Sequence, residues 1–178
     1  MSRFITLLLA VLLTASANAQ QYQPVDEKSE VKFGIKNFGL NTGGNFKGLQ
    51  GVLIFDAANP GASAFDISID ANTVNTDNNS RDNHLRKEEY FNVKNFPRIS
   101  FKSDKVIQTK GAYQVHGKLT IKGFTKEIAF PFKASIKDDG YLFEGEFRIN
   151  RRDFKVGGNS LVLGDEVNVT LFVLAKKK

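Results

Sequence analysis

Apolar and polar residues alternate along most of this chain, and this period of two restricts its fold more than any other feature. Successive side chains of a β-strand point to opposite faces, so the alternation predicts strands with one buried and one exposed face. Helical periodicity is confined to one segment near residue 80. Alternating or continuously apolar runs occur at residues 31–36, 52–55, 65–70, 113–121, 128–136 and 167–173. The sequence therefore predicts an all-β protein.

Turn-forming residues separate these runs at regular intervals. Glycine, proline, asparagine and aspartate supply the backbone conformations that tight turns need. About eight strands in hairpin order would follow, and such a count can close into a barrel or fold into a sandwich. We expect turns or loops at Gly43-Gly44, Asn59-Pro60-Gly61, Lys110-Gly111, Asp138-Asp139-Gly140 and Gly157-Gly158.

The segment from residue 80 to residue 103 departs from the alternation. Ser80 can cap a helix whose first turn holds Asp82, and we expect a short helical segment over residues 80–91. Pro97 stops any helix, because proline pushes the residue before it toward extended geometry. Residues 98–102 then alternate as a strand does. A charged helical loop is therefore expected to lead into an amphipathic strand.

The first 19 residues have the organisation of a secretory signal peptide. Arg3 precedes an apolar run from Phe4 to Leu13, and small residues lead to Ala17-Asn18-Ala19. We predict cleavage after Ala19, which leaves residues 20–178 as a single domain. The apolar run of about ten residues is shorter than the roughly 20 that span a bilayer. We therefore expect a periplasmic or secreted protein that is not integral to a membrane, with retention of residues 1–19 as an anchor as the minor alternative.

The chain has no cysteine, and its formal net charge at pH 7 is +6. The absence of cysteine excludes disulfide bonds, a lipid-modified cysteine anchor and a thiolate metal site. Lysine and arginine are interspersed with acidic residues, apart from the terminal run Lys176-Lys177-Lys178. Such a terminal run is more often a solubilising end than a membrane tether. Because no motif of basic and aromatic residues suited to stacking on bases occurs, nucleic acid is not an expected partner.

Phenylalanine dominates the aromatic residues: the chain has 16 phenylalanines and no tryptophan. Phenylalanine offers a large apolar surface without a hydrogen-bonding group, which suits an alkyl or isoprenoid chain. Aromatic residues in strands are, however, usually part of the core. Composition alone therefore favours a filled barrel over a lined cavity. The phenylalanines that could share one inward face are Phe33, Phe46, Phe55, Phe101, Phe130, Phe132 and Phe147.

Nothing in the sequence marks a catalytic or metal centre. Asp82, His84 and Glu88 could form an acid–base group, but no activated nucleophile accompanies them. His84 and His116 lie far apart in sequence, and no metal-ligand spacing or phosphate-binding glycine loop occurs. We therefore expect no enzyme activity, no cofactor and no metal.

Three motifs follow one another along the chain after residue 80. The first comprises Arg81, Asp82, His84 and Leu85, then Tyr90 and Phe91, then Phe96, Pro97, Ile99, Phe101 and Ser103. The second spans residues 115–126 (VHGKLTIKGFTK), and the third spans residues 149–154 (INRRDF). In this order they resemble the YceI-like family of secreted lipid-binding proteins, and the resemblance covers nearly the whole chain after residue 19. Many relatives carry a histidine in the first strand where this chain has Asn37.

The resemblance implies a lipocalin-like antiparallel β-barrel with the helical segment near one mouth. It also implies an exported carrier or sequestering protein that holds a long apolar lipid. The ligand that the resemblance favours is a polyisoprenoid, such as an isoprenoid quinone or a polyprenyl phosphate. An eight-stranded barrel is just wide enough for one slender ligand. The residues expected to contact the lipid tail are Phe33, Phe55, Phe101, Leu119, Ile121, Phe130, Phe132 and Phe147. Those expected to face its head are Arg81, His84 and Arg151, which can donate hydrogen bonds to phosphate or quinone oxygens.

The sequence leaves two other functions open. A filled barrel that engages a protein partner through its loops predicts no cavity and no bound lipid. A hydrolase or isomerase acting on a lipid head would use His84 as its base. For Asp82, Asn150 and Asp153, a purely structural network that pins the helical loop to the barrel is the alternative to contact with a ligand. Exposed strand edges could also support a homodimer.

Overall fold

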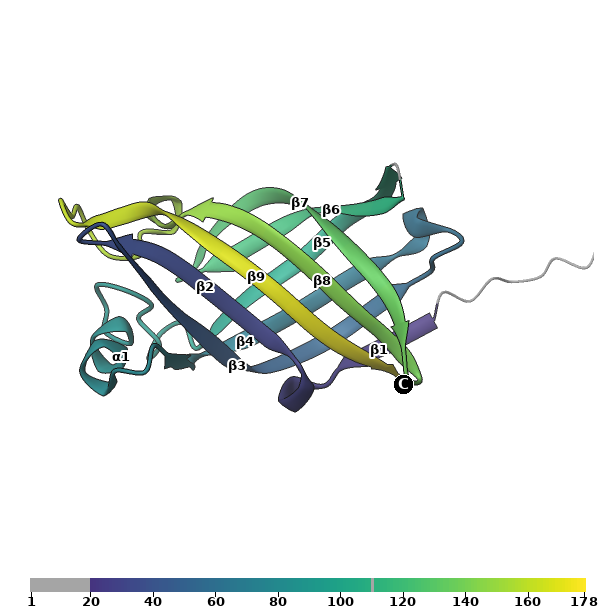
Figure 1. Ribbon diagram of the computed structural model, residues 1–178, viewed down its shortest axis with the longest axis horizontal. Coiled ribbons are helices and arrows are strands. Elements are labelled where there is room, and N and C mark those ends of the chain that lie inside the picture. The colour runs from purple at the N-terminus through teal and green to yellow at the C-terminus, as the bar shows by residue number, and fades with distance from the viewer. Residues whose placement is uncertain (1–19, 110) are drawn as a thin grey trace, which may run out of the picture.

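Nine β-strands form one antiparallel sheet in the computed structural model, which describes residues 20–109 and 111–178 (Figure 1). The predicted signal peptide, residues 1–19, lies outside the described residues. Among the described residues the only α-helix is α1 (Asn79–Leu85), and single turns of 3-10 helix occur at Asp26–Lys28, Pro60–Ala62 and Arg151–Phe154. The strands are β1 (Gln20–Pro24), β2 (Glu30–Asn37), β3 (Leu40–Phe55), β4 (Ala64–Asn75), β5 (Arg98–Thr109), β6 (Ala112–Ile121), β7 (Phe124–Lys137), β8 (Gly140–Asn150) and β9 (Leu163–Lys177).

The sheet closes into a barrel. Its strand order is β1-β3-β2-β9-β8-β7-β6-β5-β4, and β4 also pairs with β3, which completes the ring. Both β1 and β2 pair with β3 and with β9, so they act as one interrupted strand in an eight-stranded ring. The barrel prediction is confirmed, and the sandwich alternative is wrong. The pairing is incomplete at two places, because β7 pairs with β8 only over residues 132–137 and β5 pairs with β4 only over residues 98–102. A homodimer formed through strand edges therefore stays a prediction.

Asp26 and Ser29 hold the ring together at the interruption between β1 and β2. The Asp26 carboxylate accepts hydrogen bonds from the backbone N–H groups of Gly48 (3.0 Å) and Leu49 (2.7 Å) in β3. The Ser29 hydroxyl accepts one from the N–H of Leu174 in β9 (3.1 Å). These bonds satisfy backbone groups that a continuous strand would otherwise pair.

The first hairpin turns at Phe38-Gly39, so the prediction of a turn at Gly43-Gly44 is wrong. Phe38 and Gly39 both have positive φ (51° and 77°), as a two-residue turn matched to the strand twist requires. Gly43 and Gly44 lie inside β3, and Gly44 pairs with Phe33. A Cβ on Gly44 would lie 2.7 Å from the Phe33 ring. Gly44 therefore marks the close approach of a ring to the backbone rather than a turn.

The helix α1 is shorter than the predicted segment 80–91. Its N-cap is Asn78, whose side chain accepts a hydrogen bond from the N–H of Arg81 (2.9 Å), so Ser80 is not the cap. After Leu85 the chain continues as turns. Residues 87–89 are exposed, and a short helix gains little stability without an apolar face to bury.

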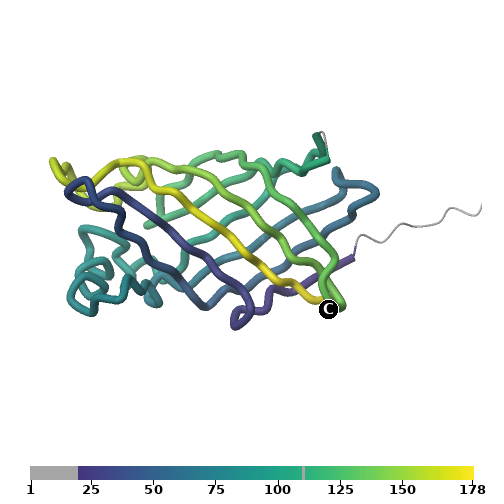
Figure 2. The backbone as a smooth tube through the Cα atoms, viewed as in Figure 1, coloured from purple at the N-terminus to yellow at the C-terminus, as the bar shows by residue number. Residues whose placement is uncertain are grey.

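Asp82 and Arg86 attach α1 to the end of β4. The buried Asp82 carboxylate accepts hydrogen bonds from the N–H (2.9 Å) and the hydroxyl (2.5 Å) of Thr76. Arg86 donates to the backbone carbonyls of Asn72 (2.8 Å) and Val74 (2.9 Å). These contacts agree with the structural alternative for Asp82. The loop that carries α1 is thereby fixed at one end of the barrel (Figure 2).

The barrel interior differs between its two ends, which we call the filled half and the hollow half. In the filled half, the end away from α1, aromatic rings pack around Phe55, which is only 2% exposed. The hollow half, at the α1 end, contains a cavity. The ring centroid of Phe55 lies 5.0–6.5 Å from those of Phe65, Tyr113, Phe132, Tyr141 and Phe143.

Among the described residues, no helix is long and apolar enough to cross a membrane.

Candidate ligand-binding site

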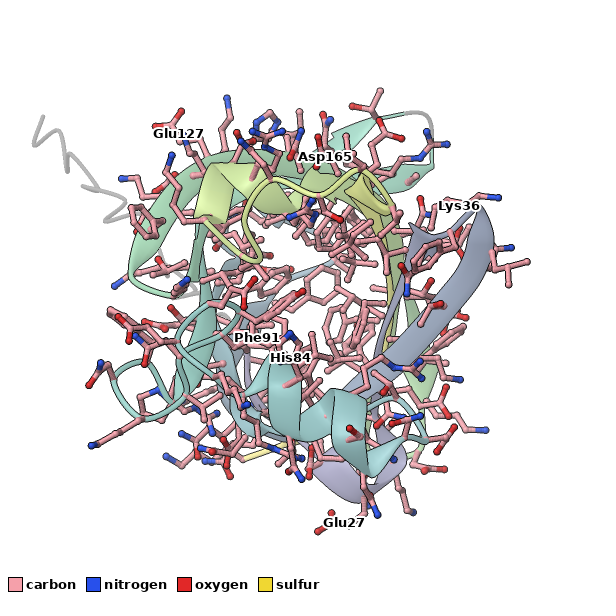
Figure 3. All side chains as sticks on the ribbon, turned by 90° about the vertical axis from the view of Figure 1, so that its left-hand side faces the viewer. Glu27, Lys36, His84, Phe91, Glu127 and Asp165 are labelled. Atoms are coloured by element: carbon pink, nitrogen blue, oxygen red, sulfur yellow. The ribbon has the colours of Figure 1, made fainter. Side chains whose placement is uncertain are left out.

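The hollow half encloses a cavity of about 380 Å³. Small-molecule sites typically measure roughly 300–1,000 Å³, so this volume suits a ligand. All eight strands of the ring, β2 to β9, contribute side chains to its wall, and the loop that carries α1 covers part of its mouth. Figure 3 looks into this end, where His84 and Phe91 lie toward the middle of the ring while Lys36 and Glu127 lie outside it.

Six of the eight residues expected to contact a lipid tail line this cavity. Phe55 and Phe132 do not. Phe55 is the centre of the filled half, and Phe132 lines a much smaller void of about 40 Å³ beside it. All eight side chains belong to or pack against the barrel core, but Phe55 and Phe132 lie at a different depth from the cavity. The six that line the cavity are Phe33, Phe101, Leu119, Ile121, Phe130 and Phe147.

Three stacked or tilted phenylalanines form the floor of the cavity. The Phe130 ring lies parallel to that of Phe147, with centroids 4.3 Å apart, and packs against Phe101 at 5.5 Å. Phe101 and Phe130 also line the 40 Å³ void on the far side. Phe101 and Phe130 thus separate the cavity from the filled half, together with Ile67, Leu171 and Val173, which also line both spaces.

The rest of the wall is mostly aliphatic, and the phenylalanine argument missed these residues. Branched side chains present no hydrogen-bonding groups, so the wall offers an apolar surface to a ligand. The alternation that predicts the strands already indicates which of their residues share a face with the phenylalanines, and this signal could have found them. They include Val31, Ile35, Ile67, Ile69, Ile99, Ile149, Val167, Val169 and Leu171.

His84 and Phe91 lie at the mouth. The imidazole of His84 packs on the Tyr90 ring with centroids 4.9 Å apart, and its Nε2 is 4.0 Å from a carboxylate oxygen of Glu89. Phe91 meets Phe46 edge to face at 5.4 Å. His84 remains exposed, so it is accessible to a ligand group at the mouth.

Arg81 also lines the cavity, but part of its guanidinium is already occupied. Its Nε donates to the Thr76 hydroxyl (2.8 Å), and one terminal nitrogen donates to the Thr76 carbonyl (2.7 Å). Thr76 is itself held by Asp82. This series of hydrogen bonds fixes the direction of Arg81. The other terminal nitrogen of Arg81, for which no bond occurs within the described residues, lies near the cavity.

Arg151 is held more completely by the protein. Its side chain is only 3% exposed, and all three guanidinium nitrogens donate to oxygens of the loop that follows it or of the first residues of β9. One donates to Asp165 at 2.9 Å. Little donor capacity remains for a lipid head, so these contacts assign Arg151 to holding the loop. The acceptors are the carbonyls of Val156, Gly157, Gly158, Leu163 and Gly164.

Lys122 joins the two loops that border the mouth. Its Nζ donates to the carbonyls of Glu89 (3.1 Å) and Lys155 (2.9 Å). Burial lowers the pKa of this amine, although the carboxylates of Glu88 and Glu89 act in the opposite direction. Two loops far apart in sequence are thereby fixed to each other.

Two asparagines lie at the ends of β2 and β8 and have different contacts. Asn37 lines the cavity at the end of β2. Asn150 caps the following 3-10 turn by accepting a hydrogen bond from the N–H of Arg152 (2.9 Å). Among the residues that the structure describes, no group of three histidine, aspartate or glutamate side chains could hold a metal ion.

A closed antiparallel barrel with an apolar cavity and a partly covered mouth defines the lipocalin-like class, whose members can hold one small ligand. Within that class, the chain belongs to the YceI-like domain family, whose sequence profile matches residues 22–175. Protein YceI of Salmonella arizonae is 31% identical to it, over 94% of this chain and 93% of that relative.

Two solved structures share the fold. BcnA of Burkholderia cenocepacia matches with a TM-score of 0.80 and 24% identity, over 84% of this chain and 98% of BcnA. A polyisoprenoid-binding domain from Saccharophagus degradans, implicated in plant cell wall breakdown, matches with a TM-score of 0.69 and 15% identity, over 88% and 98% of the two chains. At these identities the likeness concerns the fold alone.

Proposed function

We propose that this protein is an exported carrier that holds one long apolar lipid, with an isoprenoid tail, in the hollow half of the barrel. The observation that carries the proposal is the cavity of about 380 Å³, which has an apolar wall and one polar, partly covered mouth. The polyisoprenoid-binding domain of Saccharophagus degradans, which has the same fold, supports the choice of ligand.

Affinity would come mainly from the tail. Each buried methylene contributes about 0.8 kcal/mol, whereas an exposed ion pair contributes only about 0–1 kcal/mol. Association and ordering cost about 4–15 kcal/mol, so a ligand needs many buried carbons to bind well. A quinone or phosphate head would then be oriented at the mouth by His84 and Arg81.

Export is part of the proposal, and the organisation of residues 1–19 supports it. We expect the mature protein to begin at Gln20 when it is isolated from the periplasm or the culture medium. N-terminal sequencing of that protein tests this directly. A chain that still begins at Met1 and sediments with membranes would contradict it.

The central experiment is native mass spectrometry of protein purified from its own compartment, followed by organic extraction of the released ligand. We expect one isoprenoid lipid per protein. A mass without ligand, persisting after incubation with isoprenoid quinones and polyprenyl phosphates, would contradict the proposal.

A matched pair of variants assigns the ligand to the cavity. Phe130→Asp places a charge at the cavity floor, whereas Ala129→Asp places the same charge one residue earlier on the exposed outer face of β7. We expect Phe130→Asp to abolish lipid retention and Ala129→Asp to preserve it. If Phe130→Asp fails to fold, Phe147→Ser provides a milder test at the adjacent ring. Full retention in a folded Phe147→Ser variant would place the ligand elsewhere.

The alternatives predict different results. The hypothesis of a filled barrel predicts no cavity. The filled half fits this hypothesis, and the cavity of the hollow half does not. An enzyme that uses His84 as its base loses turnover in His84→Ala. For a carrier we expect only weaker discrimination between lipid heads in that variant, with tail affinity retained.

A further inference from the structure

Exposed apolar side chains gather at the mouth end of the barrel. Nine large hydrophobic side chains are exposed among the described residues. Three of them, Ile107, Ile136 and Phe172, lie on strands away from the mouth. The other six lie beside the turns and loops of the α1 end, and they are Phe38, Leu40, Phe96, Phe124, Leu161 and Val162.

Four of these side chains form one projection, which we call the apolar knuckle: Phe38, Leu40, Leu161 and Val162. The N–H of Phe38 donates to the carbonyl of Val162 (2.9 Å), which joins the β2–β3 turn to the loop before β9. The two segments lie side by side at the left end of the barrel in Figure 1. Phe38 is 74% exposed, Leu40 71% and Leu161 fully exposed.

The knuckle is continuous with the wall of the mouth. Phe38 has the positive φ of a tight two-residue turn, so the backbone holds its side chain away from the barrel. Val162 itself lines the cavity. The same loop therefore contributes to the wall of the site and to the outer projection.

We propose that the apolar knuckle inserts into the surface of an anionic phospholipid bilayer and sets the mouth of the cavity against the membrane. This inference rests on the proposed function, because a lipid with a long apolar tail must leave and enter a membrane without crossing water. The knuckle adjoins the opening through which such a tail would pass.

The chemistry of the mouth supports a bilayer as the partner. Apolar side chains on loop tips, with cationic side chains beside them, bind the boundary between headgroups and acyl chains. Lys36 lies near the end of β2, two residues before Phe38, and Lys155 lies in the loop that leads to Leu161; both are exposed. Arg152, in the 3-10 turn before that loop, is also exposed and pairs with Asp165 (3.5 Å). The knuckle consists of separate side chains on two loop tips and is not a flat apolar face. Such a shape suits insertion between lipids better than it suits a protein interface, where the two surfaces pack closely.

The test is flotation of the full protein with vesicles of phosphatidylcholine, alone and with a minor share of phosphatidylglycerol. The variant Phe38→Ser/Leu161→Ser removes two side chains of the knuckle. Ile136→Ser is the matched control, because Ile136 is 79% exposed but lies beside the β7–β8 turn at the opposite end. A third variant, Lys177→Gln/Lys178→Gln, removes cationic side chains at that opposite end.

We expect the protein to bind the mixed vesicles more tightly than phosphatidylcholine alone. Loss of each apolar side chain should weaken binding by roughly tenfold or more. Ile136→Ser and the lysine variant should bind as the parent does. Equal binding by the knuckle variant and the parent, an equal loss in Ile136→Ser, or a loss confined to the lysine variant would each overturn the proposal.

A separate measurement distinguishes failure of docking from failure of the carrier function. Binding of farnesol, added without vesicles, reports the cavity alone. We expect the knuckle variant to bind farnesol as the parent does while it loses vesicle binding. If the parent binds vesicles but no isoprenoid, the carrier proposal fails and the docking surface remains. If the parent binds isoprenoids but no vesicles, only the docking proposal fails.

Discussion

The filled half and the hollow half of this barrel both contain aromatic side chains, but these side chains have different roles in the two halves. Around Phe55, rings meet edge to face and leave almost no space. Around Phe33 and Phe147, rings and branched aliphatic side chains border a cavity instead. Close packing contributes most of the stability that an apolar interior can provide, whereas a cavity forgoes those contacts. One half therefore stabilises the barrel so that the other half can remain open.

The largest effect should follow from Phe55→Ala. Its ring is buried among five others, so we expect a loss of about 3–5 kcal/mol in the free energy of unfolding, measured by urea denaturation. Lipid retention by the fraction that folds should be unchanged, because Phe55 does not line the cavity.

The matched variant in the hollow half is Phe147→Ala. Phe147 is half-buried and borders the cavity, so its loss should cost only about 1–2 kcal/mol of stability. Isoprenoid affinity should fall clearly. Equal loss of stability in the two variants would break the distinction between the halves.

The next effect concerns the mouth. Arg151→Met leaves several backbone carbonyls without their donor and removes one of the two arginines that contact Asp165, and we expect a loss of about 2–3 kcal/mol. Hydrogen exchange should accelerate in residues 156–164, and much less in the filled half. Its exposed neighbour provides the control, since Arg152→Met should change stability by no more than about 0.5 kcal/mol. Uniform acceleration of exchange over the whole barrel would show that the mouth is not an independent region.

A smaller effect should sharpen the boundary between the halves. Phe130→Leu thins the floor that separates the cavity from the 40 Å³ void. Room for one or two further methylenes would favour longer tails by about 1–1.5 kcal/mol. Competition between isoprenoids of different length measures this preference. An unchanged preference would mean that the tail does not reach the floor.

The smallest effect should come from the outer edge of the filled half. Lys176 donates a hydrogen bond to Asp139, which lowers the pKa of that carboxyl. The stabilisation is therefore present above the ordinary pKa of aspartate, about 3.9, and is lost as the pH falls through the lower folded-state value. We expect Asp139→Asn to melt slightly below the parent at neutral pH and to match it in strong acid. A difference that persists in acid would contradict this assignment.

Alternation predicted the all-β class and most of the cavity wall, because a period of two decides which face of a strand a side chain occupies. It placed Phe101 and Phe130 on the lining face correctly. It could not separate Phe130 from Phe132, which share that face two residues apart. Depth along the barrel depends on the stagger between neighbouring strands, which no single strand encodes.

The mouth was harder to predict than the wall. The motif around Arg151 indicated an important side chain, but most of its partners are backbone carbonyls, which carry no signal in the sequence. The prediction of a turn at Gly43-Gly44 was wrong because the sequence does not distinguish two roles of glycine. A glycine can make room for a neighbouring ring, as Gly44 does for Phe33, or it can reverse the chain direction. Local composition thus predicts elements better than it predicts their tertiary contacts.

The pairing of Tyr22 in β1 with Lys177 in β9 brings the two ends of the described chain together, at the end of the barrel away from α1. A fluorescent protein or a surface anchor joined to either end would therefore stand behind the barrel and leave its opening clear. The molecule can be immobilised or tracked in a cell with its opening toward the solution. One such fusion would allow ligand binding at the opening to be measured while the protein is held at a surface.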